Sequence, residues 1–134
     1  MSVEIIQCDE ALPVRCERVL IGQVMLNLAF NAVEALHETT HGFITLATSR
    51  NGEFAEMHVI DNGPGVSDDA LDRLFDGFSS SKEGGNGIGL SLCRNIVTRH
   101  DGRIWAQRSV TGWLDCRFTL PRRCTPDCMI ALSA

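Results

Sequence analysis

The stretch FITLATSRNGEFAEMHVID, residues 43–61, decides the fold class. Residues 43–49 and 54–61 are rich in strand-forming side chains, and the Asn51-Gly52 pair between them is the strongest short-range hairpin signal. The stretch therefore predicts two antiparallel strands. A hairpin sheet disfavours a Rossmann fold, although GNGIG at residues 85–89 invites that reading. GNGIG follows no predicted strand and lacks the G-x-G-x-x-G spacing of the dinucleotide motif.

Outward from this hairpin, hydrophobic periodicity predicts the other elements. Before the hairpin, residues 17–36 carry apolar side chains four apart, which predicts a long core helix. Ser67 is placed to cap a short helix over residues 68–75, and residues 87–100 form another helix. Asp101-Gly102 closes that helix, with Gly102 in the left-handed conformation. The remaining predictions are strands over 3–7, 103–109 and 113–120, a connection through Pro13, a loop over 76–86 and a frayed tail.

Length and composition fit one folded unit. The chain has 134 residues, 44% of them hydrophobic, which is ordinary for a single domain. Alternating strands and helices with hairpins predict an α/β fold, in detail a two-layer α+β sandwich with a mixed, mostly antiparallel sheet and helices on one face. We expect one domain over residues 1–121 and a C-terminal tail over 122–134.

The same composition excludes several classes of protein. A net charge of −5 argues against a nucleic-acid partner, and no apolar run is long enough to cross a bilayer, so we expect no direct membrane contact. The N-terminal residues show no basic region followed by an apolar core, so we expect no secretory signal in this chain. The six cysteines form no C-x-x-C pair, and Cys93 and Cys116 fall in apolar stretches, which indicates reduced thiols and a cytoplasmic location.

Polar side chains interrupt the long helix. Asn27, Asn31 and Glu34 are four and three residues apart and so share one helix face. Amides in an apolar helix need partners, and either a structural hydrogen-bond network or a ligand or Mg²⁺ site would supply them. The residues alone leave both readings open.

Two further positions suit a ligand. Asp61 ends a strand just before Gly63 and Gly65, so its carboxylate either orders its own turn or accepts a hydrogen bond from a ligand amine. The glycines of residues 85–89 open a helix, where backbone amides favour an anion, unless they are simply a flexible linker.

The order of these motifs resembles a known family. QVMLNLAFNAVEAL (23–36), DNGPGV (61–66), LFDGFSSSK (74–82) and GGNGIGLSL (84–92) are similar to the N, G1, F and G2 boxes of the GHKL superfamily. The resemblance covers about residues 3–121 and is specific to the catalytic ATP-binding domain of sensor histidine kinases, most like the nitrogen-fixation and nitrogen-regulation group. It implies a Bergerat fold with a lid over bound ATP.

The resemblance also implies roles for individual residues. Asn31 would coordinate Mg²⁺, Asn27 would support the phosphates and metal, and Asp61 would accept the adenine amino group, helped by a water near Gly65. Lys82, the only lysine, would approach the terminal phosphate from the lid. Phe75 and Phe78 would pack the base of the lid. The other residues that the resemblance assigns to the nucleotide pocket are Gly63, Gly85, Gly87, Ile88, Gly89 and Leu90.

The resemblance favours a kinase over a hydrolase. Hydrolysing relatives carry a glutamate base where this chain has Asn27, and an amide cannot accept a proton from water. Glu34 stands where many kinases have a basic residue, and its role, assisting Mg²⁺ or capping the polar face, stays open. None of the four histidines has the sequence context of a phosphoacceptor. We therefore expect a separate helical dimerisation and phosphoacceptor domain as partner, a response regulator as indirect partner, and little autophosphorylation by the isolated chain.

Two alternatives accompany this prediction. His37-Glu38-Thr39-Thr40-His41 matches the H-E-x-x-H signature of zinc proteases, but its threonines and Gly42 place it at a fraying helix end. A degenerate ATP-binding adaptor would keep the fold without the chemistry, although the intact glycines of the G1 and G2 boxes and Asn31 argue against it.

Overall fold

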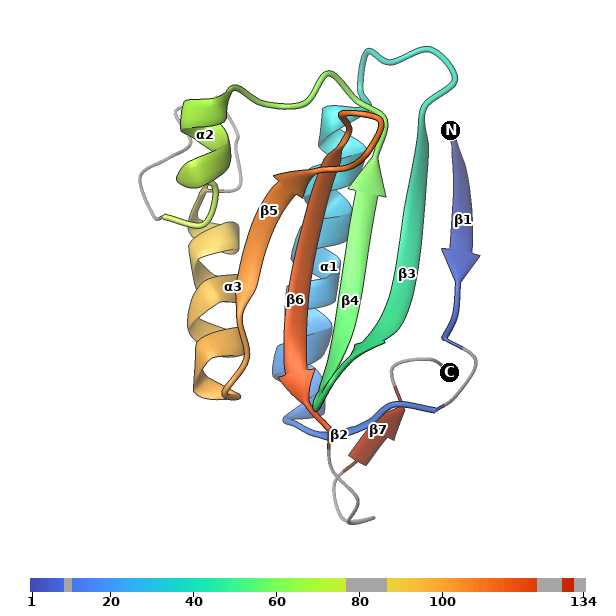
Figure 1. Cartoon of the computed structure of the whole chain (residues 1–134). Coiled ribbons are helices and arrows are strands. Elements are labelled where there is room, and N and C mark those ends of the chain that lie inside the picture. The colour runs from blue at the N-terminus through green and yellow to red at the C-terminus, as the bar shows by residue number, and fades with distance from the viewer. Residues whose placement is uncertain (9–10, 77–86, 123–128, 132–134) are drawn as a thin grey trace.

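Strands form a mixed sheet in the computed structural model, which describes residues 1–8, 11–76, 87–122 and 129–131 (Figure 1). The order across this five-stranded sheet is β1-β3-β4-β6-β5. β1 runs parallel to β3, and each of the other neighbouring pairs in the sheet is antiparallel. The strands are β1 (Ser2–Ile6), β3 (Phe43–Asn51), β4 (Phe54–Asp61), β5 (Ile104–Arg108) and β6 (Leu114–Pro121). The mixed, mostly antiparallel sheet is confirmed.

Helices cover one face of this sheet. α1 (Arg18–Ala35) lies behind the strands, α3 (Gly87–Arg99) packs against α1 and appears beside β5, and α2 (Asp68–Asp72) lies at one end (Figure 1). Ser67 caps α2 as predicted, since its Oγ accepts a hydrogen bond from the backbone N–H of Ala70 at 3.2 Å. The predicted two-layer α/β sandwich is therefore confirmed.

The core lies between the helices and the sheet. Strand side chains alternate between the two faces, so every second residue of β4 and β6 points toward the helices. The buried apolar residues of these two strands are Ala55, Met57, Val59, Leu114, Cys116, Phe118 and Leu120. They meet the buried residues of the helices, which include Ile21, Val24, Leu28, Ala32, Cys93, Ile96 and Val97. The prediction that Cys93 and Cys116 behave as small apolar side chains is confirmed.

Some local predictions differ from the structure. β2 (Pro13–Arg15) pairs with β7 (Met129–Ala131), a contact between the predicted connection and the predicted frayed tail. Pairing across more than one hundred residues leaves no local signal in segments of three residues. α2 ends at Asp72 rather than at Phe75, because i→i+3 turns replace the helix: the N–H of Arg73 donates to Ala70 O, and that of Asp76 to Arg73 O.

The end of α3 also differs. Asp101, not Gly102, has the positive φ of 64°. Glycine is required at 102 for space, because a Cβ atom there would lie 1.9 Å from the carbonyl oxygen of Thr119.

Within the described residues, no helix is long and apolar enough to cross a membrane.

Candidate functional site

A cavity of about 470 Å³ opens where α1, β4 and β6 end. It brings together Asn31 and Glu34 of α1, Asp61 at the end of β4, and Gly65 of the following turn. The rest of its lining is mostly apolar: Val33, Ala35, His37, Pro64, Val66, Leu74 and Leu114. An apolar cavity with a few converging polar groups is the usual form of a small-molecule site. A slightly larger cavity, about 520 Å³, lies between α2, α3 and β5 and contains none of the predicted ligand-binding residues.

Asp61 is the buried polar anchor of the cavity. Its side chain is 2% exposed, and its Oδ1 accepts the backbone N–H of Gly63 at 2.9 Å. This bond fixes the carboxylate and shows that Asp61 does order its own turn. Because Asp61 also lines the cavity, the two roles predicted as alternatives are compatible: Oδ1 holds the turn, and the carboxylate can accept a hydrogen bond from a ligand.

The turn after β4 depends on close packing. A Cβ atom on Gly63 would lie 2.8 Å from the carbonyl oxygen of Ala35 and 2.9 Å from Asp61 Oδ1, so a larger residue would displace α1 or the carboxylate. Gly65 has a φ of +77°, which other residues rarely adopt. Both positions therefore have a structural reason to be glycine, close packing at Gly63 and a positive φ at Gly65.

Asn62 supports the turn beside the cavity, a role that the sequence reasoning missed. Its Oδ1 accepts the N–H of Phe43 at 2.7 Å, and its Nδ2 donates to the carbonyl of His41 at 3.2 Å. The side chain thus ties the turn to the start of β3. The signal was present, because Asn before glycine after a strand is typical of a residue that bonds nearby backbone.

The polar face of α1 divides between two environments. Asn31 and Glu34 line the cavity, whereas Asn27 does not. Asn27 Oδ1 accepts a hydrogen bond from Gln23 Nε2 at 3.1 Å, and its side chain is hydrogen-bonded to the Cys93 thiol of α3. Burial raises the pKa of Cys93, and the bond to Asn27 partly offsets that rise. The structural network predicted as one alternative therefore exists at Asn27, and Asn31 and Glu34 are the members of the face that lie in the cavity.

Asn31 and Glu34 fit a magnesium ion. An amide carbonyl and a carboxylate are oxygen donors, and Mg²⁺ in nucleotide sites usually takes few protein ligands and keeps phosphate and water oxygens. Among the described residues, no group of three or more His, Cys, Asp and Glu side chains could hold a metal by itself.

The glycine-rich segment opens α3. Gly87 and Gly89 lie in the first turn of this helix, where free amides favour an anion. Leu90 is 2% exposed and packs in the core, and Phe75 belongs to the same core cluster. The packing of Phe75 against the base of the lid stays a prediction. The predicted residues Phe78, Lys82 and Gly85 lie outside the described residues, and so do residues 77–86 of the predicted lid.

The zinc-protease alternative is wrong for this fold. α1 ends at Ala35, so His37 and His41 lie in turns and not on one face of a helix, and His41 has a φ of 58°. The H-E-x-x-H signature needs two histidines one helical turn apart. Here the match in sequence is accidental.

Comparisons with known proteins give consistent results. The family described as histidine kinase-, DNA gyrase B- and HSP90-like ATPase matches residues 16–123. The sensor protein FixL of Bradyrhizobium diazoefficiens is 38% identical over 109 residues, which cover 81% of this chain and 22% of FixL. The C4-dicarboxylate transport sensor protein DctS of Rhodobacter capsulatus is 43% identical over 110 residues, which cover 81% of this chain and 17% of DctS.

Solved structures agree in fold. The catalytic domain of histidine kinase ThkA, in a nucleotide-free form, superposes with a TM-score of 0.78 at 29% identity, covering 90% of this chain and 79% of that domain. Full-length ShkA in complex with AMPPNP gives a TM-score of 0.72 at 26% identity, covering 98% of this chain and 27% of ShkA. ThkA in complex with the response regulator protein TrrA gives 0.73 at 27% identity, covering 90% of this chain and 34% of that chain.

Proposed function

The chain belongs to the family of histidine kinase-, DNA gyrase B- and HSP90-like ATPases, as a catalytic ATP-binding domain of the sensor histidine kinase type, and from this premise we propose how its site works. We propose that the cavity at Asp61 binds ATP with Mg²⁺ and presents the γ-phosphate to a histidine on a separate helical hairpin. The chain spans about a fifth of the length of FixL and DctS, so the activity of a whole kinase, its partners and a cytoplasmic location are part of the proposal.

The carrying observation is the buried carboxylate of Asp61. Gly63 holds Oδ1 through its N–H, which leaves the carboxylate fixed in a mostly apolar cavity. An adenine ring fits such a cavity, and its amino group is a donor that the carboxylate can accept. A water near Gly65 would complete the contacts to the base. A hydrogen bond to a charged acceptor is stronger than a neutral one, so Asp61 would select adenine.

The phosphates would lie along α1 toward α3. Asn31 would contribute its carbonyl oxygen to Mg²⁺, with Asn27 supporting the phosphates and metal; when bound, the ion supplies positive charge to the phosphate oxygens. The amides of Gly87 and Gly89 at the start of α3 support the same placement, because they favour anions. Gly85, Ile88, Leu90 and Lys82 complete the proposed nucleotide contacts, with Lys82 near the terminal phosphate.

Transfer to histidine is favoured over hydrolysis. In the transfer, the bond between the γ-phosphorus and ADP breaks and a bond to an imidazole nitrogen forms. Activation of water would need a general base, and the amide of Asn27 cannot serve as one. An imidazole is itself a nucleophile, so a site that positions phosphate and neutralises its charge suffices. The response regulator is the proposed second recipient, as ThkA is seen in complex with TrrA.

Phosphotransfer in trans tests the proposal. The chain is mixed with [γ-³²P]ATP, Mg²⁺ and a separately purified phosphoacceptor hairpin of a sensor histidine kinase. We expect acid-labile, alkali-stable label on the hairpin, lost when its histidine is replaced or when the chain carries Asp61→Ala. Label that persists with Asp61→Ala would contradict the proposal. So would release of free phosphate in the absence of the hairpin at the rate at which the hairpin is labelled in its presence.

A further inference from the structure

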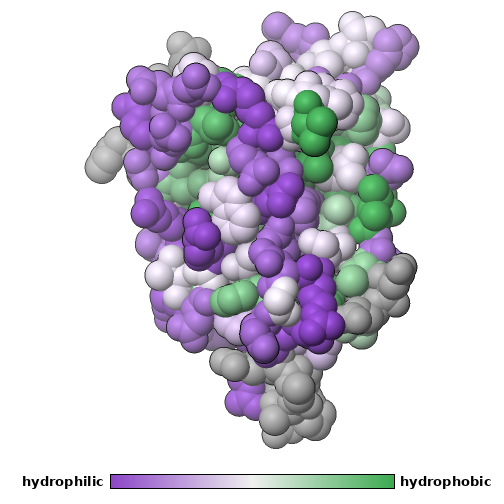
Figure 2. Space-filling model, viewed as in Figure 1, coloured by the Kyte–Doolittle hydropathy of each residue, from purple (hydrophilic) through white to green (hydrophobic). Residues whose placement is uncertain are grey.

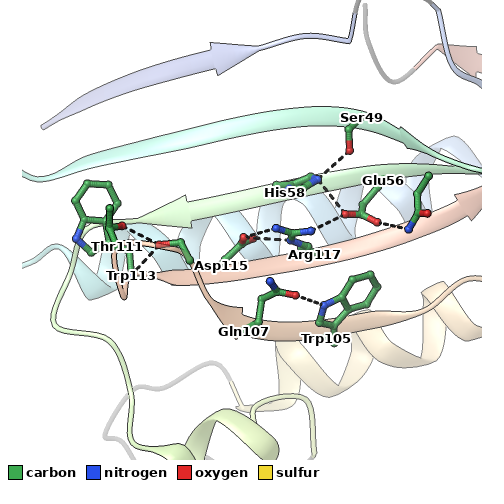
Figure 3. Close-up of polar contacts among 11 residues, drawn as sticks. Ser49, Glu56, His58, Trp105, Gln107, Thr111, Trp113, Asp115 and Arg117 are labelled. Carbon is green, nitrogen blue, oxygen red and sulfur yellow. Dashed lines mark hydrogen bonds and ion pairs between the residues drawn. The ribbon is translucent and has the colours of Figure 1, made fainter.

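Another cavity lies on the face of the sheet opposite the proposed nucleotide site. Its volume is about 480 Å³, and one row of residues across four strands contributes to it: Thr45, Ile60, Asp115 and Gln107. The segment from Arg108 to Trp113, which joins β5 to β6, forms its wall. Figure 3 shows the polar residues of this face pointing away from α1. Figure 2, viewed from the same side as Figure 1, shows hydrophilic side chains gathered along the middle of the sheet.

This face contains buried carboxylates in excess of buried cations. Glu56 is 4% exposed and Asp115 is 1% exposed, and both face the one guanidinium of Arg117. Arg117 Nη1 donates to Glu56 Oε2 at 2.9 Å, and its Nη2 and Nε donate to Asp115 Oδ2 at 2.9 and 3.1 Å. His58 adds no positive charge at neutral pH, because burial and Arg117 lower its pKa. The cluster therefore has one more carboxylate than cation.

One oxygen of this cluster lacks a partner. Asp115 Oδ1 is buried and accepts no hydrogen bond from the described residues, whereas Oδ2 accepts two from Arg117. An unsatisfied buried carboxylate oxygen is costly, and a ligand with N–H donors would satisfy it. Asp115 lines the cavity, so such a ligand would reach the carboxylate from there.

The ligand should be a cation. Both arginines that line the cavity are already engaged: Arg117 as above, and Arg108 with Asp68 at 2.6 Å and with the carbonyl of Val66 at 2.8 Å. An anion would meet the carboxylate of Asp115 without an available guanidinium among these residues. Trp113 adds an aromatic surface, held by an edge-to-face contact with Phe43 at 5.1 Å between ring centroids, and aromatic rings attract cations.

We propose that this cavity binds the guanidinium group of an arginine side chain presented by a partner protein. Asp115 Oδ1 accepts from the guanidinium, Trp113 packs beside it, and the hydroxyls of Ser109 and Thr111 at the rim offer further acceptors. A planar group with five donors fits acceptors spread over a sheet row and a neighbouring hairpin better than a compact ammonium does. The inference does not depend on the proposed nucleotide site, which lies on the other face of β4 and β6.

The probe for this cavity is N-acetyl-arginine N-methylamide. The ¹⁵N-labelled chain is titrated with it, and with the isosteric but neutral citrulline compound and the N-acetyl-lysine analogue. We expect saturable shifts of the Trp113 indole N–H and the Gln107 side-chain amide with the arginine compound, and at least about tenfold weaker binding of the citrulline compound. Equal binding of arginine and citrulline compounds, tighter binding of the lysine compound, or no saturable shift would overturn the proposal.

Two variants that change the number of carboxylates in the cavity in opposite directions complete the test. Asp115→Asn should weaken binding of the arginine compound at least about tenfold. Gln107→Glu adds a second carboxylate to the row of sheet residues that lines the cavity, and it should tighten binding severalfold. Asp69→Asn, on an exposed position of α2, makes the same charge change outside the cavity and should leave binding unchanged. If Asp115→Asn fails to fold, Gln107→Glu still decides, since weaker or unchanged binding there would contradict the proposal. ADP binding should be the same in all variants.

Discussion

Asp61→Asn is the substitution that most sharply tests the adenine contact. The change keeps the shape of a side chain that is 2% exposed and removes its charge. Because the N–H of Gly63 requires an oxygen at the Oδ1 position, the new amide should direct its NH₂ group toward the ligand. When adenine is bound, the NH₂ group of the substituted side chain and the adenine amino group are two donors that face each other. The O6 atom of hypoxanthine is instead an acceptor for that NH₂ group.

The expected loss follows from one hydrogen bond to a charged group. Such a bond contributes about 1.5–3 kcal/mol, which corresponds to about 10- to 150-fold in the dissociation constant. Calorimetric titration with ADP and with inosine diphosphate measures the affinity of the variant for an adenine and for a hypoxanthine nucleotide. We expect weaker ADP binding in this range, unchanged or tighter inosine diphosphate binding, and hence a smaller preference for adenine.

The refuting result is equally specific. Thermal unfolding and circular dichroism first establish that Asp61→Asn keeps the fold. If the folded variant binds ADP within about twofold of the wild type, or if both nucleotides weaken equally, Asp61 does not contact the adenine amino group.

Three further predictions concern stability and the metal. Gly102→Ala should lower the free energy of unfolding by about 1–3 kcal/mol in chemical denaturation, because its Cβ would lie 1.9 Å from Thr119 O. The control is Gly22→Ala, in open space on α1, which should be neutral or slightly stabilising. Equal effects of the two substitutions would contradict the packing argument. The pKa of His58 lies below its ordinary value of 6.5 in the folded state, so the unfolded chain binds more protons and the free energy of unfolding should fall as pH drops below about 6.5. His58→Gln should reduce this dependence on pH in denaturation curves recorded between pH 7.5 and 5. An unchanged dependence would contradict the lowered pKa of His58. Asn31→Ala should abolish most of the gain in nucleotide affinity that Mg²⁺ gives, measured by calorimetry with and without the ion, while a retained gain would remove Asn31 from the metal site.

The fold was predictable where local patterns are strong. The Asn51-Gly52 hairpin, the alternation of Leu114, Cys116, Phe118 and Leu120, and the four-residue spacing along α1 each report on one element. β2 and β7 were not predictable, because strands of three residues that pair across the chain depend on tertiary contacts. The position of Gly102 illustrates the same limit, since its closeness to Thr119 belongs to the packed sheet and not to the helix end.

The candidate site was predictable in its residues more than in its geometry. Motif order placed Asn31 and Asp61 together, and the structure brings both to one cavity. The same motifs gave Asn27 a supporting part toward the phosphates and metal, which stays a prediction; its hydrogen bond to Cys93 of α3 is a contact that the motifs did not indicate. Local patterns do not reveal that Asp115 is buried: Arg117 bonds both Asp115 of β6 and Glu56 of β4, and that contact between strands has no local signature.

Titration of the chain with AMPPNP, with and without Mg²⁺, tests the central claim most directly, with Zn²⁺ titrated separately. We predict one nucleotide bound per chain, tighter when Mg²⁺ is present, and no such binding by Asp61→Ala. Absence of nucleotide binding by the folded wild-type chain, or stoichiometric Zn²⁺ binding in its place, would contradict the assignment of this cavity to ATP.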